Sequence, residues 1–182
     1  MKKIFLYGSL ICFLVSCNNA DKKSLTAETN PAAATEKATV DLPYTASYSS
    51  SFDNDVSDAD LKMVLMSYKD WADSNVQKVV DVMADTLNYD SPNGETSKLT
   101  RAELLKRWGT FRDSLSSVKI EMQAWHKMHS MDKKDKFIVT WYKEYDTYKN
   151  GKVDSNYWHD INQVKDGKIN WYSQYKRPMK KM

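Results

Sequence analysis

The sequence predicts an α+β fold, in which helices come first and an antiparallel meander of strands follows. Between Ser57 and Leu115 the apolar residues recur at helical spacing, and from Ser117 onward they alternate with polar residues. Asn150-Gly151 and Asp166-Gly167 divide the alternating half, and both are strong hairpin signals because their residues tolerate positive φ angles. Helices followed by hairpin-linked strands are typical of the α+β class.

Capping residues define the first two predicted helices. The segment Ser57-Asp58-Ala59-Asp60 resembles a capping box with an acid in place of the usual Glu, and it opens a helix that continues to Trp71. After Ala72-Asp73-Ser74-Asn75, a second and shorter helix carries apolar residues from Val76 to Met83.

A short strand and a third helix complete the first half of the domain. Thr86 to Tyr89 predict the strand, which ends at Ser91-Pro92-Asn93-Gly94. Thr100-Arg101-Ala102-Glu103 is a full capping box, and it opens a helix through Leu115. Four strands are then predicted, at residues 118–129, 136–149, 152–165 and 168–175.

The first residues of the chain predict export and lipid anchoring. Lys2 and Lys3 precede an apolar run from Ile4 to Val15, which is too short to span a bilayer and is typical of a signal peptide. Ser16 before Cys17 resembles a bacterial lipoprotein box, which implies that residues 1–16 are removed and that Cys17 is acylated. Asn18 then favours the outer over the inner membrane, by resemblance to the lipoprotein sorting rule. We expect an envelope protein held to the membrane through Cys17.

Composition sets the domain boundaries. Residues 17–55 are poor in large apolar side chains and predict a flexible tether, with Tyr44, Tyr48 and Phe52 beginning to dock near its end. The folded domain is expected at 56–177, followed by a basic tail at 178–182.

Composition also narrows the function classes. Both cysteines, Cys12 and Cys17, precede the domain, so the domain has no disulfide or thiolate metal site. The net charge of +3 is small and dispersed, which argues against nucleic acid. His129 and His159 have no acidic or cysteine partner at ligand spacing, so neither a metal nor a cofactor is predicted.

The hairpins predict which side chains share a face of the sheet. Counted as two-residue loops, they place Asp160 opposite both Trp141 and Ser173, and Asn162 opposite Trp171. The face expected beneath the helices then carries Phe137, Val139, Trp141, Tyr145, Trp158, Val164, Ile169, Trp171 and Tyr175. The opposite face is a candidate surface for a homodimer, and it carries Ile138, Thr140, Tyr142, Glu144, Tyr157, His159, Ile161, Asn170, Tyr172 and Gln174.

Two polar residues are predicted to point inward among these aromatics. Burial would raise the pKa of Asp160, and such a carboxyl can hydrogen-bond a ligand or move a proton. The alternative is a structural Asp bonded to Ser173, Asn162 or a tryptophan N–H. His126 alternates with apolar neighbours and is expected about 10 Å from Asp160, as a flanking ligand contact or as a structural histidine.

Particular residues resemble a known superfamily. They are the stretch Trp71-Ala72-Asp73-Ser74-Asn75 through Met83-Ala84-Asp85-Thr86, then Asn88 to Gly94, and finally Asp166-Gly167-Lys168-Ile169. Over residues 57–177 the chain resembles the nuclear-transport-factor-2-like superfamily, which includes SnoaL-like polyketide cyclases and ketosteroid isomerase. The resemblance implies a cone, in which helices close a strongly curved antiparallel sheet over an apolar pocket.

The resemblance carries over only part of the isomerase site. The base position falls on Ser91, which cannot take a proton at neutral pH. The oxyanion-binding tyrosine falls near Ser67, with Tyr68 one step away, and the second acid falls on Asp160. The resemblance therefore does not imply steroid isomerisation by that route.

The sequence leads to one principal functional hypothesis and two rivals. The principal one is a non-catalytic, lipid-anchored domain that binds a small apolar or amphipathic molecule, or a protein partner. Its pocket would be formed by Tyr89, Ser91, Trp108, His126, Trp141, Trp158, Asp160 and Trp171. The first rival is a cyclase, isomerase or hydrolase with Asp160 as general acid and His126 as base. The second is a structural module that dimerises through its sheet.

Overall fold

The computed structural model describes residues 41–180 of the chain. The chain divides into two units, Met1–Asp41 and Leu42–Met182, and every helix and strand below belongs to the second. The predicted signal peptide, Cys17 and the tether up to residue 40 lie outside the described residues. No helix within residues 41–180 is long and apolar enough to cross a membrane.

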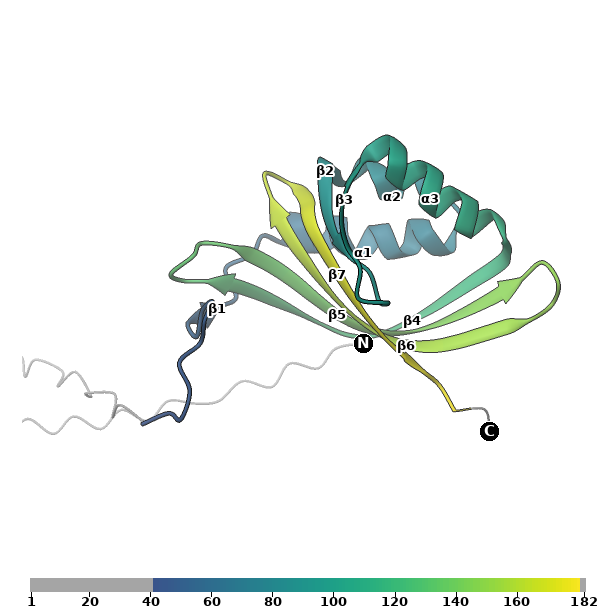
Figure 1. Ribbon diagram of the computed structural model, residues 1–182. Helices are drawn as coiled ribbons and strands as arrows, with labels where there is room; N and C mark the ends of the chain where they lie inside the picture. The colour runs from purple at the N-terminus through teal and green to yellow at the C-terminus, as the bar shows by residue number, and fades with distance from the viewer. Residues whose placement is uncertain (1–40, 181–182) are drawn as a thin grey trace, which may run out of the picture. The chain divides into compact units, whose positions relative to one another are not determined.

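Helices cover one face of a seven-stranded sheet (Figure 1). The helices are α1 (Asp58–Ala72), α2 (Val76–Asp81) and α3 (Arg101–Asp113). The strands are β1 (Phe52–Asp53), β2 (Met83–Asp90), β3 (Thr96–Thr100), β4 (Leu115–Ser130), β5 (Lys136–Tyr148), β6 (Val153–Lys165) and β7 (Lys168–Pro178). The predicted α+β class is confirmed.

The predicted caps start two of the helices. The Ser57 hydroxyl accepts from the Asp60 amide at 3.0 Å, which fixes the first turn of α1. Thr100 and Glu103 form the reciprocal capping box of α3, with the Thr100 amide donating to the Glu103 carboxylate at 2.8 Å. Local sequence therefore determines where these helices begin.

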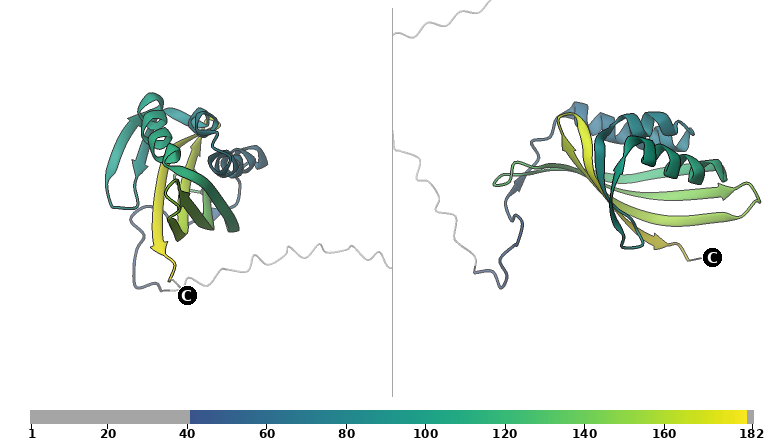
Figure 2. Two further views of the ribbon diagram at one scale, coloured as in Figure 1. Left: turned by 90° about the vertical axis from the view of Figure 1, so that its right-hand side faces the viewer. Right: turned by 45° about the horizontal axis from the view of Figure 1, so that its top comes forward.

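The sheet is strongly curved, and its strands run in the order β1-β4-β5-β6-β7-β2-β3. All neighbours are antiparallel except β2 and β7, which pair in parallel. Figure 2 shows from two further sides that α1 and α3 lie over the concave face. Strand β3 and the parallel pairing of β2 were not predicted, because both depend on contacts between distant segments.

The register of the sheet differs from the predicted one at the β5–β6 hairpin. The loop has three residues, Lys149 to Gly151, because the Tyr148 amide donates to the Lys152 carbonyl at 2.8 Å. Thr147 therefore pairs with Val153, and Trp141 pairs with His159 instead of Asp160. A shift of one residue moves a side chain to the other face of the sheet, so Trp141 and Asp160 lie on opposite faces and the prediction that they share one is wrong.

Two β-bulges shift the register further. The Asp166-Gly167 turn has two residues as predicted, but Asn170 is an extra residue in β7, so Asp160 pairs with Gln174 instead of Ser173. Gln123 is an extra residue in β4, between Met122 and Ala124. Bulges bend a strand and increase its twist, which contributes to the curvature of this sheet.

The concave face consequently carries a partly different set of residues from the predicted one. Trp158, Val164 and Ile169 belong to the core or pack against it, as expected. Ile138, Tyr142 and Tyr172 join them in place of Trp141, Trp171 and Tyr175. The core remains apolar and aromatic, but its members on β5 and β7 change.

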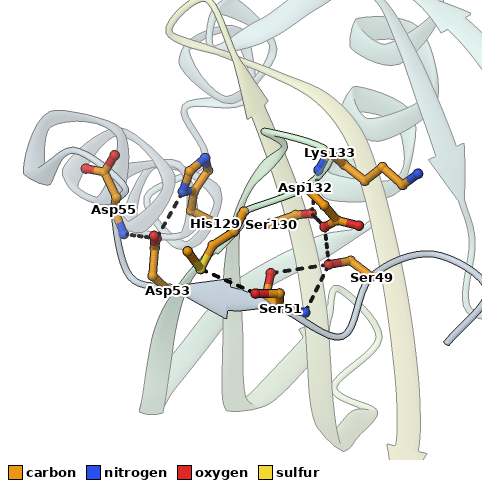
Figure 3. Close-up of polar contacts among 9 residues, drawn as sticks. Ser49, Ser51, Asp53, Asp55, His129, Ser130, Asp132 and Lys133 are labelled. Carbon is orange, nitrogen blue, oxygen red and sulfur yellow. Dashed lines mark hydrogen bonds and ion pairs between the residues drawn. The ribbon is translucent and has the colours of Figure 1, made fainter. Parts of the chain in front are cut away.

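A short N-terminal segment docks on the β4–β5 hairpin (Figure 3). We call residues 48–53 the strap. Its Ser49 hydroxyl donates to Asp132 at 2.5 Å, and its Asp53 carboxylate lies 3.0 Å from the Nδ1 atom of His129. Tyr48 also donates to Asp135. The end of the predicted tether therefore contacts the domain.

Candidate functional site

A cavity of about 440 Å³ lies between the helices and the concave face of the sheet. Side chains from α1, α2, α3, β2, β5, β6 and β7 form it, together with the turn after β2. The lining residues are Ser67, Tyr68, Trp71, Val79, Met83, Tyr89, Ser91, Pro92, Asn93, Arg107, Trp108, Phe111, Tyr142, Glu144, Asp146, Tyr148, Trp158, Asn162, Tyr172, Gln174 and Lys176.

Aromatic rings form much of the cavity wall. Trp108 meets Tyr89 and Tyr172 edge-on, with ring centroids 6.1 and 6.3 Å apart. Trp71 and Phe111 stack nearly parallel at 6.1 Å. Rings in contact with one another hold their orientations, so this wall has a defined shape before any ligand arrives.

Asp160 lies beneath the floor of the cavity, with no exposed surface. Its Oδ2 atom accepts hydrogen bonds from the hydroxyls of Tyr172 at 2.6 Å, Tyr142 at 2.9 Å and Tyr68 at 3.1 Å. Gln174 adds a longer contact at 3.4 Å. Three phenols from α1, β5 and β7 thus converge on one carboxylate oxygen, while Oδ1 has no partner among the described residues.

The pKa of Asp160 reflects two opposing effects. Burial raises it from 3.8 to about 6, and the hydrogen bonds from Tyr172, Tyr142, Tyr68 and Gln174 act in the other direction. Burial, together with the nearby charge of Asp160, raises the pKa of each of the three tyrosines well above its ordinary value. The phenols therefore keep their protons and serve as donors to Asp160.

Two further acids face the cavity from β5. Glu144 and Asp146 follow Tyr142 at alternate positions, and their exposed fractions are 5% and 3%. Burial raises the pKa of Asp146 to about 6. Burial, followed by repulsion from Asp146 and Asp160, raises that of Glu144 well above its ordinary range. The cavity therefore combines an aromatic wall with acidic groups that are poorly solvated.

The predicted pocket residues divide into two sets. Tyr89, Ser91, Trp108 and Trp158 line the cavity, and Asp160 lies directly under its floor. His126, Trp141 and Trp171 do not line it, so their prediction as pocket residues is wrong.

Each of these three misplacements has a physical cause. The bulge at Gln123 turns His126 outward, where it pairs with Val139 and is exposed. The three-residue loop turns Trp141 outward onto His159, at a ring distance of 4.9 Å. The bulge at Asn170 turns Trp171 outward, where its indole donates to Asp90 at 2.7 Å.

Sequence reasoning missed the polar half of the site. Tyr142, Glu144 and Asp146 were assigned to the outer face or left out, and Tyr172 and Gln174 were placed on the outer face as well. A signal was available, because these five residues alternate along two strands that flank Asp160. It required the correct loop length and bulge positions.

Metal ligation has no evident site in the part of the chain that the structure describes. No group of three or more His, Cys, Asp or Glu side chains converges there.

Comparison with known proteins identifies the fold. No family model matches the sequence, and no curated protein matches it. Solved structures do resemble it. A putative polyketide cyclase from Acidithiobacillus ferrooxidans is 15% identical with a TM-score of 0.52, over 66% of this chain and 89% of that one. An NTF2-like protein of unknown function from Burkholderia pseudomallei is 12% identical with a TM-score of 0.53, over 66% and 92%.

A third similar structure is SalBIII, described as an epoxide hydrolase/cyclase-like enzyme in pyran ring formation in the polyether salinomycin. It is 15% identical with a TM-score of 0.55, over 65% of this chain and 90% of that one. The domain therefore has the nuclear-transport-factor-2-like fold. This is the fold that the resemblance implied.

Proposed function

We propose that this chain is a lipid-anchored domain of the cell envelope that binds a small amphipathic ligand without transforming it. The observation that carries the proposal is the cavity of about 440 Å³, with an aromatic wall and a polar floor. Ligand pockets are typically about 300–1,000 Å³, mostly apolar, with a few placed polar groups. The cavity of this domain fits that description.

The geometry favours binding over catalysis. The acid–base pair expected from Asp160 and His126 does not form, because His126 is exposed on the far face of the sheet. The hydroxyls of Tyr142 and Tyr172 direct their protons to Asp160 and away from the cavity. These two hydroxyls therefore offer acceptor oxygens, and not protons, to a ligand in the cavity.

The anchoring part of the proposal is supported by the lipoprotein-like sequence that ends at Cys17. Several acyl chains on one cysteine hold a protein durably, because each buried methylene contributes about 0.8 kcal/mol. By resemblance to the lipoprotein sorting rule, Asn18 supports the outer membrane over the inner one.

Binding can be tested with a neutral fluorescent probe, N-phenyl-1-naphthylamine, whose emission rises in apolar surroundings. We expect saturable enhancement, which a cavity-filling Ser67→Met substitution weakens at least tenfold. Ser117→Met, at an exposed position on β4, is the matched control and should bind as the unchanged protein does. Equal binding by both variants would place the probe outside the cavity and refute the proposal.

A second candidate function is acid–base catalysis of the cyclase, isomerase or hydrolase kind. The observation that favours it is Asp160, a buried carboxyl whose pKa burial raises to about 6. Carbon-13 NMR titration of the Asp160 carboxyl tests the role. A pKa near 4 would remove Asp160 as an acid at neutral pH.

A homodimer through the outer face of the sheet is a further proposal about partners. Trp141, His159 and Tyr175 form a row of rings across β5, β6 and β7 on that face, with the first pair stacked and the second tilted. Tyr142 lies on the cavity side and so cannot contribute. Tyr157→Glu combined with Tyr175→Glu should yield monomers by sedimentation, and an unchanged profile would refute the dimer.

A further inference from the structure

We infer that the ligand of the cavity carries a positively charged nitrogen, seated between the aromatic wall and the carboxylates of Glu144 and Asp146. This inference rests on the function proposed above and specifies the chemical class of the ligand. The ligand would be an organic ammonium compound with an apolar or aromatic body.

The first argument is the lack of partners for these carboxylates. Within residues 41–180 neither Glu144 nor Asp146 forms an ion pair. The Oδ1 atom of Asp146 has no hydrogen-bond partner there. A buried carboxylate without a partner is unfavourable, and a cation brought by a ligand would relieve that cost.

Two cationic side chains, Lys176 and Arg107, line the cavity, and both already have an acidic partner. Lys176 pairs with Asp154 at 3.4 Å, and Arg107 approaches Glu95 at 3.9 Å. The Arg112 guanidinium is buried and donates to main-chain carbonyls, including that of Trp71 at 3.0 Å. Lys176 and Arg112 oppose the effect of burial on the pKa of Glu144 and of Asp146, but neither cation forms an ion pair with these carboxylates.

The second argument is the set of aromatic rings that share the cavity with the acids. Trp71, Phe111, Tyr148 and Trp158 line the same cavity as the two carboxylates. Aromatic faces attract ammonium groups, by about 2 kcal/mol or more where the pair is desolvated. The wall already receives one such group, because the Lys176 ammonium lies 5.5 Å from the centroid of the Trp158 ring.

The charged and titratable groups around this end of the cavity determine its pH dependence. They are Asp154 and Asp160 on β6, Lys176 on β7, Arg112 on α3, and the two acids on β5. A bound cation favours ionised acids. Affinity should therefore rise as pH increases through the pKa of Asp146, near 6, and rise further as Glu144 ionises, because burial raises the pKa of Glu144 well above its ordinary range.

The test measures calorimetric binding of three probes to the domain. Benzyltrimethylammonium has a permanent charge, so any pH dependence of its binding belongs to the protein. Neopentylbenzene is its neutral isostere, and 3-phenylpropionate supplies the opposite charge. We expect the cation to bind at least tenfold more tightly than either, and about tenfold more tightly at pH 7.5 than at pH 5.

Glu144→Gln and Asp146→Asn should each weaken binding of the cation at least tenfold and leave binding of the neutral probe within twofold. Glu121→Gln alters an acid on β4 that does not line the cavity, so it should change binding of neither the cation nor the neutral probe. Thermal unfolding of each variant verifies that the domain remains folded.

The outcomes separate the two proposals. If the neutral probe or the anion binds as tightly as the cation, the inference about charge is wrong and the binding function stands. If the cation binds but neither acid variant weakens it, the assigned site is wrong. If no probe binds at millimolar concentration, both the inference and the proposed function fail.

Discussion

Replacing Asp160 with Asn should stabilise the domain at neutral pH, and by an amount that depends on pH. Asp160 has no exposed surface, and its pKa rises from 3.8 to about 6 on folding because burial disfavours the charged form. Asn has nearly the shape of the protonated acid and cannot ionise. The Asp160→Asn variant thus keeps the floor of the cavity in its uncharged form at every pH.

The magnitude follows from the shift in pKa. The folded protein binds the Asp160 proton more tightly than the unfolded chain, so the contribution of this group to stability is fully present below pH 3.8 and is lost as pH rises through about 6. A shift of about two pKa units corresponds to about 3 kcal/mol. The difference in unfolding free energy between the variant and the unchanged protein should widen by most of that amount between pH 4 and pH 8, since part of the contribution is already lost at pH 4.

Urea unfolding followed by tryptophan fluorescence at pH 4, 6 and 8 measures this gap. Asp113→Asn, at an exposed position at the end of α3, is the matched control and should show a gap that does not vary with pH. If the difference in unfolding free energy between Asp160→Asn and the unchanged protein stays constant or narrows as pH rises, burial does not dominate the titration of this carboxyl and the argument is refuted.

Three further predictions concern the floor, the buried cation and the strap. Tyr172→Phe removes the hydroxyl 2.6 Å from Asp160, so the pKa of Asp160 should rise further in an NMR titration; a fall would contradict the assigned direction of the hydrogen bond. Arg112→Met removes the three hydrogen bonds that the guanidinium donates to main-chain carbonyls, and chemical denaturation should show a loss of about 3 kcal/mol in the free energy of unfolding. An unchanged midpoint would show that water replaces the guanidinium. Ser49→Ala removes the hydrogen bond from the strap to Asp132. The Met131 amide, which donates to the Ser51 carbonyl, should then exchange its hydrogen at least several times faster. An unchanged exchange rate would mean that β1 docks without this contact.

Local chemistry made most of the elements predictable. The caps at Ser57 and Thr100, the helical spacing after each, and the two glycine turns each act within a few residues. The resemblance to a cone fold then followed from the order of the elements. Strand β3 and the parallel pairing of β2 escaped prediction because nothing close in sequence encodes them.

Which residues line the cavity was much harder to predict, because that depends on the register of the strands. Three irregularities of one residue each move the following side chains to the other face of the sheet. They lie at the Lys149–Gly151 loop, at Gln123 and at Asn170. Asp160 was nevertheless predicted to point inward and does so, together with Trp158. The tryptophans expected beside Asp160 are replaced by tyrosines, whose hydroxyls can hydrogen-bond a buried carboxylate.

The bulge at Gln123 affects whether another chain can add to the edge of the sheet. Strand β4 has sixteen residues and, within residues 41–180, pairs along its outer side only where β1 meets His129 and Ser130. A long uncovered strand invites another chain to add to it and start a fibril. The extra residue interrupts the regular row of amides, and charges such as Lys119 disfavour close approach. The irregularity that turns His126 away from the cavity would thereby also protect the domain from aggregation.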